Sequence, residues 1–238
     1  MNRTAAGEEQ AVAVSGTISL KRRPDNLTYS VYEAIKQAIV DGRLPANTRV
    51  TEAALARQLV VSKTPVREAL LRLKEIGLIE AEGPKAGRIV SPSYNRMRDV
   101  YEVREALEAT SARVAAERGD RTLLLAVKRK AEATVAAAEA DDVPGYQRAD
   151  EAFHRTLAKA GGNERLARLI DDANVLVGVL RQRDTPELGA SLLCAERHVM
   201  IADAALAGHA DDAFRLMAQH VREVRDAVLA PLAGEGAG

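Results

Sequence analysis

One helix in the N-terminal half constrains the fold more than any other stretch, because both its start and its buried face can be read from the residues. The stretch LVVSKTPVREALLRLKEIGLIE covers residues 59–80. Ser62 is the expected N-cap, and Pro65 falls in the first turn, where a missing backbone N–H costs no intrahelical hydrogen bond. The predicted buried stripe, with apolar residues at helical spacing, consists of Val66, Leu70, Leu73 and Ile76.

Cations lie beside this apolar stripe. At about 100° per residue, Lys63, Arg67 and Lys74 fall within a sector of about 40° that borders it. The bland interpretation is a solvated basic face on an ordinary small domain. The alternative is a recognition helix, whose N-terminal residues Lys63, Thr64 and Arg67 could reach base edges or phosphates in the major groove of DNA.

The flanking segments complete a small domain. LTYSVYEAIKQAIVDGRL predicts a first helix that stops at its Asp-Gly pair, and TEAALARQL predicts a second helix with Thr51 as N-cap. After Gly77 the sequence predicts two short strands, at 78–82 and 87–91. Three helices followed by a basic hairpin are typical of a winged helix-turn-helix, so the expected fold class is mainly α with a small β wing.

The rear half predicts a separate helical bundle. From residue 94 onward every segment has a helical period and ends at Gly, Pro or Asp. The predicted breaks are Gly119-Asp120, Asp141 to Gly145, Gly161-Gly162, Pro186 with Gly189, and Gly208. Five or six antiparallel helices predict an all-α bundle with room for an internal pocket. The expected domains are a flexible tail (1–25), a DNA-binding domain (26–93) and this bundle (94–238).

Charge and cysteine content narrow the class of protein. Residues 21–93 hold 13 Lys and Arg against 8 Asp and Glu, whereas residues 94–238 hold 20 against 24. A basic front half is expected where only that half meets a polyanion. No stretch has the length or apolar core of a membrane span or signal peptide, so we expect a cytoplasmic protein. The single cysteine, Cys194, leaves His and carboxylate side chains as ligands for any metal.

The front half resembles a known DNA-binding domain. TEAALARQLVVSKTPVREALLRLKEIGLIEAEGPKAGRIV is similar to that of the GntR family of bacterial transcription regulators, over residues 28–91. SKTPVREALLRL is its most specific piece. The resemblance implies that Ser62, Lys63, Thr64, Arg67 and, in the wing, Gly87 contact DNA. It also makes Arg57 and Arg43 candidates for phosphate contacts.

Two positions depart from the family pattern. Val60 stands in the turn where the family usually has Gly, and valine disfavours the left-handed backbone conformation, so we expect a differently built turn. Lys63 stands where the family usually has Arg. A lysine gives up bidentate contact with guanine, which leaves the specificity at that base open.

Three of the four histidines fall on apolar helix faces: His154, His198 and His220, whereas His209 sits in a loop. Asp150 precedes His154 by one turn on the same side. A lone histidine beside a core is more often structural than a ligand. Three histidines and a carboxylate directed into one bundle suit Zn²⁺, with Ni²⁺ or another transition ion as alternatives.

The segments around these histidines also resemble a known domain. DEAFH, ERHVMIADAAL and AFRLMAQHV are similar to the FCD effector-binding domain of the FadR subfamily, over about residues 97–228. The resemblance implies a metal ion held by Asp150, His154, His198 and His220.

Arg104 lies on a predicted apolar stripe. That stripe consists of Val100, Val103, Leu107 and Val114. Arg104 could simply pair with Glu108 at i+4. The FCD resemblance favours instead a cation that points into the pocket and binds a carboxylate that also ligates the metal. Asn174 and Arg225 are weaker candidates for the same pocket wall.

Together these features predict a ligand-responsive, DNA-binding transcription regulator. We expect a homodimer on a pseudo-palindromic operator, with a small carboxylate or sugar acid as effector. One alternative is a metal sensor without an organic effector. The other is a metal-dependent hydrolase, which lacks a dedicated base because Glu151 and Glu196 adjoin the ligands in sequence but are expected to point elsewhere. We therefore expect no enzyme.

Overall fold

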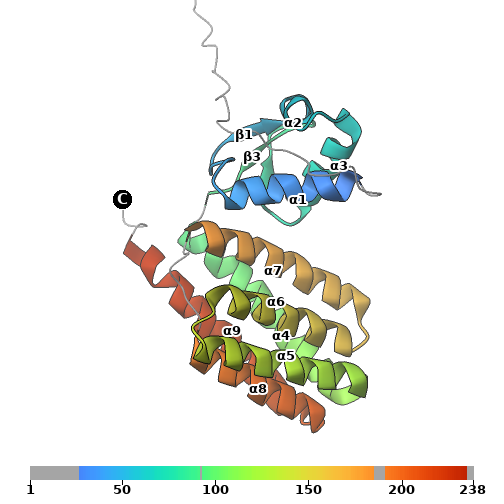
Figure 1. Cartoon of the computed structure of the whole chain (residues 1–238), viewed down its shortest axis with the longest axis vertical. Helices are drawn as coiled ribbons and strands as arrows, with labels where there is room; N and C mark the ends of the chain where they lie inside the picture. The colour runs from blue at the N-terminus through green and yellow to red at the C-terminus, as the bar shows by residue number, and fades with distance from the viewer. Residues whose placement is uncertain (1–26, 92, 185–190, 235–238) are drawn as a thin grey trace, which may run out of the picture. The chain divides into compact units, whose positions relative to one another are not determined.

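The computed structural model describes residues 27–91, 93–184 and 191–234 (Figure 1). The chain divides into two compact units, one within residues 1–91 and the other within 92–238. The tail expected over 1–25 and the break expected at Pro186 and Gly189 lie outside the described residues. In the described part no helix combines the length and the apolar character that crossing a membrane requires.

The first unit is a winged helix-turn-helix, as predicted. Its helices are α1 (Leu27–Val40), α2 (Glu52–Leu59) and α3 (Lys63–Glu75), and its strands are β1 (Arg49–Thr51), β2 (Ile79–Ala81) and β3 (Ala86–Ile89). The strands pair antiparallel in the order β1-β3-β2. All four residues of the predicted stripe on α3 are buried, which confirms the helical reading of that stretch.

Some details of this unit differ from the prediction. Strand β1 was not predicted, because three residues are too short to show an alternating pattern. Thr51 caps α2 as expected, with its hydroxyl accepting from the backbone N–H of Ala54 at 3.2 Å. Ser62 occupies the N-cap position of α3, but its side chain makes no capping hydrogen bond. Lys74 is not free at the basic face, because its Nζ donates to the carbonyl oxygen of Ala86 at 2.9 Å.

The turn between α2 and α3 contradicts the prediction for Val60. Val60 adopts the left-handed conformation, with φ 55° and ψ 46°, at the C-cap of α2. Its backbone N–H closes the helix by bonding the carbonyls of Ala56 and Arg57. The turn thus keeps the geometry that glycine would adopt, although a β-branched residue is strained in it. The valine is 83% exposed, so packing of its side chain does not offset this strain.

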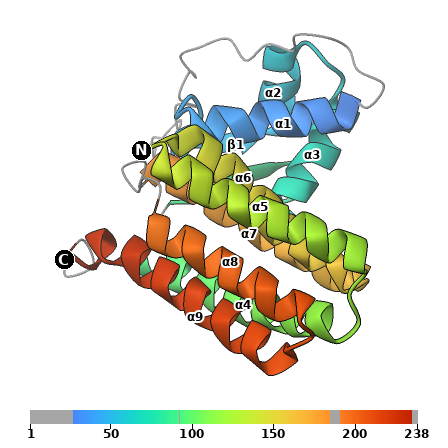
Figure 2. The ribbon, with the colours of Figure 1, turned by 60° about the horizontal axis from the view of Figure 1, so that its bottom comes forward.

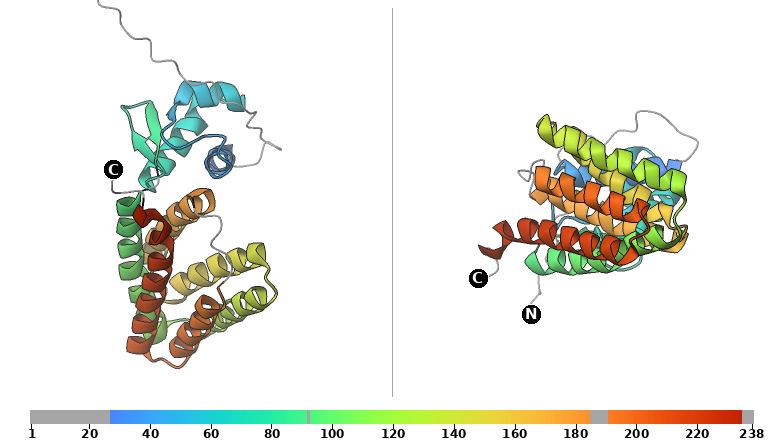
Figure 3. Two further views of the ribbon diagram at one scale, coloured as in Figure 1. Left: turned by 90° about the vertical axis from the view of Figure 1, so that its left-hand side faces the viewer. Right: turned by 90° about the horizontal axis from the view of Figure 1, so that it is seen from below.

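The second unit is an all-α bundle. Its elements are α4 (Tyr94–Arg118), α5 (Arg121–Glu139), α6 (Val143–Ala160), α7 (Glu164–Asp184), α8 (Leu192–Leu206), α9 (Ala210–Leu229) and the short 3₁₀ helix η1 (Pro231–Gly234). Helix α4 runs alongside α9, and α5 packs against both α6 and α8 (Figures 2 and 3). Segments far apart in the chain therefore meet in the interior.

The predicted breaks between helices serve largely as caps. Asp120 accepts from the N–H of Leu123 at 2.9 Å, and Asp142 accepts from the N–H of Gly145 at 2.9 Å. Because Asp142 caps α6, that helix begins at Val143, and Gly145 lies in its first turn instead of in the connection. A side-chain cap replaces the hydrogen-bond partner that the first backbone N–H groups lack.

The buried face of α4 differs most from the sequence prediction. Val103, placed on the apolar stripe, is 51% exposed. Val100, Leu107 and Val114 are only half-buried. The interior face instead carries Tyr101, Arg104 and Glu108, all nearly inaccessible to solvent. A row of polar side chains on a buried helix face requires partners inside the bundle, and these partners define the candidate site.

Candidate metal centre and candidate DNA interface

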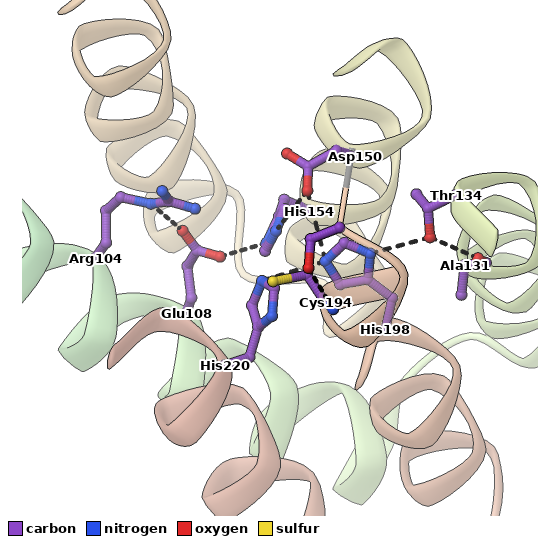
Figure 4. A network of polar contacts seen from close by, with 10 residues as sticks. Arg104, Glu108, Ala131, Thr134, Asp150, His154, Cys194, His198 and His220 are labelled. Atoms are coloured by element: carbon purple, nitrogen blue, oxygen red, sulfur yellow. Dashed lines mark hydrogen bonds and ion pairs between the residues drawn. The ribbon is translucent and has the colours of Figure 1, made fainter. Parts of the chain in front are cut away.

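Three helices bring three histidines to one point of the bundle. His154 comes from α6, His198 from α8 and His220 from α9, and each is buried. Each histidine offers a ring nitrogen within 4.8 Å of those of the other two (Figure 4). The sequence placed these residues on apolar faces, and the packing of the helices brings the faces together.

The spacing of the donor atoms fits a single ion. His198 Nε2 lies 3.2 Å from His220 Nε2. Asp150 Oδ1 lies 3.5 Å from His198 Nε2 and 3.8 Å from His154 Nε2. Nitrogen and oxygen ligands about 2.0–2.2 Å from one zinc ion stand slightly more than 3 Å from each other in a tetrahedral site. The described donors thus need only small movements to surround a divalent cation.

The protonation states of His198 and His220 are also those that metal binding requires. Burial, reinforced by electrostatic repulsion from the neighbouring His154, holds the pKa of His198 well below its ordinary value. Burial, followed by electrostatic repulsion from His198 and His154 when either ring takes up a proton, does the same to the pKa of His220. Imidazole coordinates a metal only when one ring nitrogen is unprotonated. Both residues are therefore in the ligand form at neutral pH.

A carboxylate and a guanidinium form a second layer behind His154. Glu108 Oε2 lies 2.5 Å from His154 Nδ1, although the two atoms lack the alignment of a hydrogen bond. Arg104 Nε donates to Glu108 Oε1 at 2.7 Å. Burial alone would raise the pKa of Glu108, but Arg104 and His154 hold it well below the usual range. The layer is thus a buried ion pair that contacts a candidate ligand, an arrangement common behind metal-bound histidines.

Thr134 on α5 is a hydrogen-bond partner of His198 that the sequence did not predict. Its hydroxyl lies 3.2 Å from His198 Nδ1 and 2.7 Å from the carbonyl oxygen of Ala131. A threonine inside a helical pattern carries no signal that it contacts a histidine 64 positions away. Only the packing of α5 against α8 brings the two together.

The three residues predicted to bind an effector have different surroundings. Arg104 is buried and paired with Glu108, which confirms the simpler interpretation; its contact with an effector stays a prediction. Asn174 on α7 has a buried side-chain oxygen without a partner among the described residues. Arg225 pairs with Asp226 at 2.9 Å, and no contact in the described part of the chain joins it to the histidines.

Tyr101 is a polar residue of this region that the sequence did not reveal. The Cζ atom of Arg104 lies 5.2 Å from the centre of its ring. The residue is buried, and its hydroxyl has no hydrogen-bond partner in the described ranges. The sequence pattern hid it because the predicted stripe lies beside the buried face of α4 and does not include position 101.

In the first unit, the N-terminal end of α3 faces solvent. Ser62, Lys63, Thr64 and Arg67 are all exposed, as contact with DNA requires. Lys63 and Arg67 line a cleft, together with Arg49 of β1 and Lys85 at the tip of the wing. The cleft therefore has cations on several sides, together with two carboxylates, Glu52 and Glu82.

The other predicted DNA contacts differ in accessibility. Arg57 is exposed on α2, and Arg43 is half-buried and paired with Asp41 at 2.8 Å. Gly87 is buried in β3, where an added Cβ would lie 2.9 Å from the carbonyl oxygen of Glu80 and still closer to Ile79. This environment explains the glycine by close packing of the wing and leaves it little surface for DNA.

Comparison with known proteins agrees with both units. Residues 27–89 match the family of bacterial regulatory proteins of the gntR type, and residues 99–223 match the FCD domain. The chain is 30% identical over 191 residues to the probable D-xylose utilization operon transcriptional repressor of Paenarthrobacter nicotinovorans, covering 80% of this chain and 84% of the relative.

Further relatives support the same conclusion. An uncharacterized HTH-type transcriptional regulator from the TAR-I ttuE-ttuC' intergenic region of Agrobacterium vitis is 40% identical over 131 residues, 54% of this chain and 77% of that protein. The solved structure of E. coli McbR/YncC has the same fold, with a TM-score of 0.68 at 21% identity over 86% of this chain and 97% of the other. The two sequence relatives are named as transcription regulators and not as enzymes. The chain thus combines a winged unit that presents cations with a helical unit that buries a histidine cluster. It belongs to the gntR family of DNA-binding transcription regulators with an FCD domain.

Proposed function

We propose that this regulator holds a divalent metal ion through Asp150, His154, His198 and His220 and uses it to bind a small carboxylate effector. The observation that carries the proposal is the convergence of three buried imidazoles, two of them held neutral, beside one carboxylate. This donor set suits Zn²⁺ first and Ni²⁺ or a similar ion second. When bound, the ion supplies a positive centre to which a carboxylate or hydroxy-carboxylate can coordinate.

Buried polar groups near the cluster support an organic effector. The Tyr101 hydroxyl and the Asn174 side-chain oxygen are buried without partners among the described residues. An unmade buried hydrogen bond costs about 1–3 kcal/mol, and a polar ligand could remove that cost. Arg104, beside Tyr101, adds a guanidinium that can bind a carboxylate. One relative is named for D-xylose utilization, so sugar acids belong among the candidate ligands.

On the DNA side, we propose that the exposed residues Ser62, Lys63, Thr64 and Arg67 read an operator. Arg57 and Arg43 are proposed phosphate contacts, and the exposed wing-tip residue Lys85 takes the place proposed for Gly87. Two recognition helices on successive major grooves require a homodimer and a pseudo-palindromic operator. The intact donor set also supports placing the chain in the FadR subfamily.

A metal sensor without an organic effector is the second candidate. One observation favours it: Arg104 Nε is committed to Glu108, so the charge of Arg104 is already balanced. In that case the ion itself would distinguish the DNA-competent state from the other. An effector can shift such an equilibrium only by binding the two states with different affinity.

A thermal-shift experiment on the full chain separates these functions. The chain is measured after chelation, with Zn²⁺ or Ni²⁺, and with each ion plus a panel of small carboxylates and sugar acids. A ligand at 100 times its dissociation constant adds about 2.7 kcal/mol of stability. We expect metal to raise the melting temperature, and one class of acid to raise it further only when metal is present.

The matched control is the His220→Asn variant, which removes one proposed ligand. It should lose the response to metal and with it the response to acids. If metal raises the melting temperature and no acid adds to the shift, the metal sensor is favoured. If neither ion changes the wild-type melting temperature, the metal proposal is wrong.

A further inference from the structure

Thr134 is a fully buried hydroxyl that bonds both to its own helix and to a histidine of another helix. Its exposed fraction is 0%, and that of His198 is also 0%. The hydroxyl oxygen lies 2.7 Å from the carbonyl oxygen of Ala131 and 3.2 Å from His198 Nδ1 (Figure 4). Both atoms are shielded from water, so the protons of this small network must be distributed within it.

The number of protons decides the direction of each hydrogen bond. A threonine hydroxyl has one hydrogen to donate and lone pairs to accept with, whereas a carbonyl oxygen can only accept. The 2.7 Å separation from Ala131 is typical of O–H···O, and two oxygens without a hydrogen between them would repel at this distance. The Thr134 hydroxyl therefore donates to Ala131, and it accepts from His198 Nδ1–H at 3.2 Å.

From this we infer that Thr134 is a positioning residue that fixes His198 as the Nδ1–H tautomer. A neutral imidazole carries its hydrogen on only one nitrogen, so Nε2 of His198 keeps its lone pair. That nitrogen lies 3.2 Å from His220 Nε2 and 3.5 Å from Asp150 Oδ1. Thr134 thus presents the His198 lone pair to the donor cluster.

The geometry also fixes the tautomer of His220. Two lone pairs facing each other at 3.2 Å would repel, so His220 Nε2 carries a hydrogen and donates it to His198 Nε2. Its Nδ1 is then an acceptor, and this atom is buried without a partner in the described structure. His198 and His220 therefore hold opposite tautomers in this arrangement.

The inference that Thr134 affects metal affinity rests on the proposed metal site, but the tautomers themselves do not. They can be measured in the chelated full chain, labelled with ¹⁵N-histidine, from two-bond ¹H–¹⁵N correlations of the rings. Signals are assigned from His198→Asn and His220→Asn variants, each of which removes one set. We expect Nδ1–H for His198 and Nε2–H for His220. A wild-type His198 that carries its hydrogen on Nε2 would overturn the inference.

Two variants test the role of the hydroxyl. Thr134→Val keeps the shape of the side chain and removes the acceptor, so the Nδ1–H signal of His198 should weaken or change to the other tautomer. Thr134→Ser keeps a hydroxyl and should restore the wild-type signal. If the valine variant folds and retains the wild-type tautomer, Thr134 does not set it.

Metal affinity supplies the second readout, by calorimetric titration of the full chain with Zn²⁺. Loss of the hydrogen-bond partner of a metal-bound histidine weakens metal affinity by about 10- to 100-fold. We expect a loss of this size for Thr134→Val and an affinity within about threefold of wild type for Thr134→Ser. The control is Thr156→Val on α6, where the hydroxyl donates at 2.7 Å to the carbonyl of Ala152 and contacts no ring nitrogen among the described contacts.

The outcomes remain distinguishable. Unchanged Zn²⁺ affinity in Thr134→Val, or an equal loss in Thr156→Val, contradicts a specific role for Thr134. A wild-type chain that binds no Zn²⁺ contradicts the proposed metal site, and the ring spectra of the chelated protein then test the tautomer assignment by themselves.

Discussion

Arg67 Nε lies 3.4 Å from Glu52 Oε1, and of these two side chains the arginine is 57% exposed while the glutamate is only 5% exposed. Glu52 is the first residue of α2, and Arg67 lies in the second turn of α3. The buried carboxylate contacts the guanidinium through Nε. The outer nitrogens of Arg67 can therefore face outward, which is the orientation that bidentate contact with guanine requires.

The first prediction concerns Arg67. Arg67→Ala should weaken binding to the specific operator by about 1–3 kcal/mol and relax preference at one base pair, because a base contact is lost. Arg57→Ala, which removes an exposed cation on α2, should instead weaken binding to all sequences and reduce the salt dependence. Fluorescence anisotropy with the operator and single-base variants checks both. Equal losses on specific and random DNA for Arg67→Ala would exclude it from base readout.

The second prediction concerns the strained turn. Val60→Gly should stabilise the first unit by about 0.5–1 kcal/mol, because relief of about 1–2 kcal/mol of left-handed strain exceeds the entropy that glycine loses on folding. Hydrogen exchange of the α2 and α3 amides in the full chain measures this unit separately from the bundle. Ala54→Gly, on the exposed side of α2, is the control and should speed exchange. Faster exchange in Val60→Gly would contradict the strain.

The third prediction concerns the second layer. Glu108→Gln should destabilise the metal-free bundle by about 3–5 kcal/mol, because Arg104 becomes a buried charge without a counter-ion. It should also weaken metal binding by about 10- to 100-fold through His154. Denaturant unfolding and metal titration check the two effects. A double variant, Arg104→Met with Glu108→Gln, should recover much of the stability, and failure to recover would show that the charge of Arg104 is not the cause.

The fourth prediction follows from the lowered pKa values of His198 and His220. As pH falls below about 6.5, the unfolded chain takes up protons at these residues while the folded chain resists them. Stability of the chelated protein should therefore fall with decreasing pH, by up to about 1.4 kcal/mol per pH unit for each residue. Urea unfolding from pH 7.5 to 5.5 measures the slope. Replacing both histidines by leucine should flatten it, and an unchanged slope would assign it to other groups.

Sequence predicted the fold well where the pattern was local and strong. The stripe on α3 and the Thr51 cap follow from spacing and chemistry within a few residues, and the family match covers both units. The prediction for the turn at Val60 was wrong. It assumed that the energetic cost of a left-handed valine would force the turn into a different conformation. The surrounding structure holds that conformation against a strain of only about 1–2 kcal/mol.

The residues of the candidate site also differ in whether the sequence could predict them. The histidines could be found because each falls on an apolar face, where a polar residue is conspicuous. Tyr101 was missed because the interior face of α4 mixes polar residues, such as Arg104 and Glu108, with apolar ones, so the apolar pattern did not mark that face. Thr134 could not be found because its partner lies on α8, and no pattern within α5 reports which helix packs against it.

The three histidines that meet in the bundle come from positions separated by 44 and then 22 residues along the chain. A ligand bound to all three would act on the chain as a reversible cross-link, closing two loops that together span from α6 to α9. Because a preformed site is absent from the unfolded chain, the binding free energy of the ion would add to the stability of the folded bundle. Stripping the ion would then affect more than the three histidines: it would shorten the lifetime of the whole bundle against proteolysis.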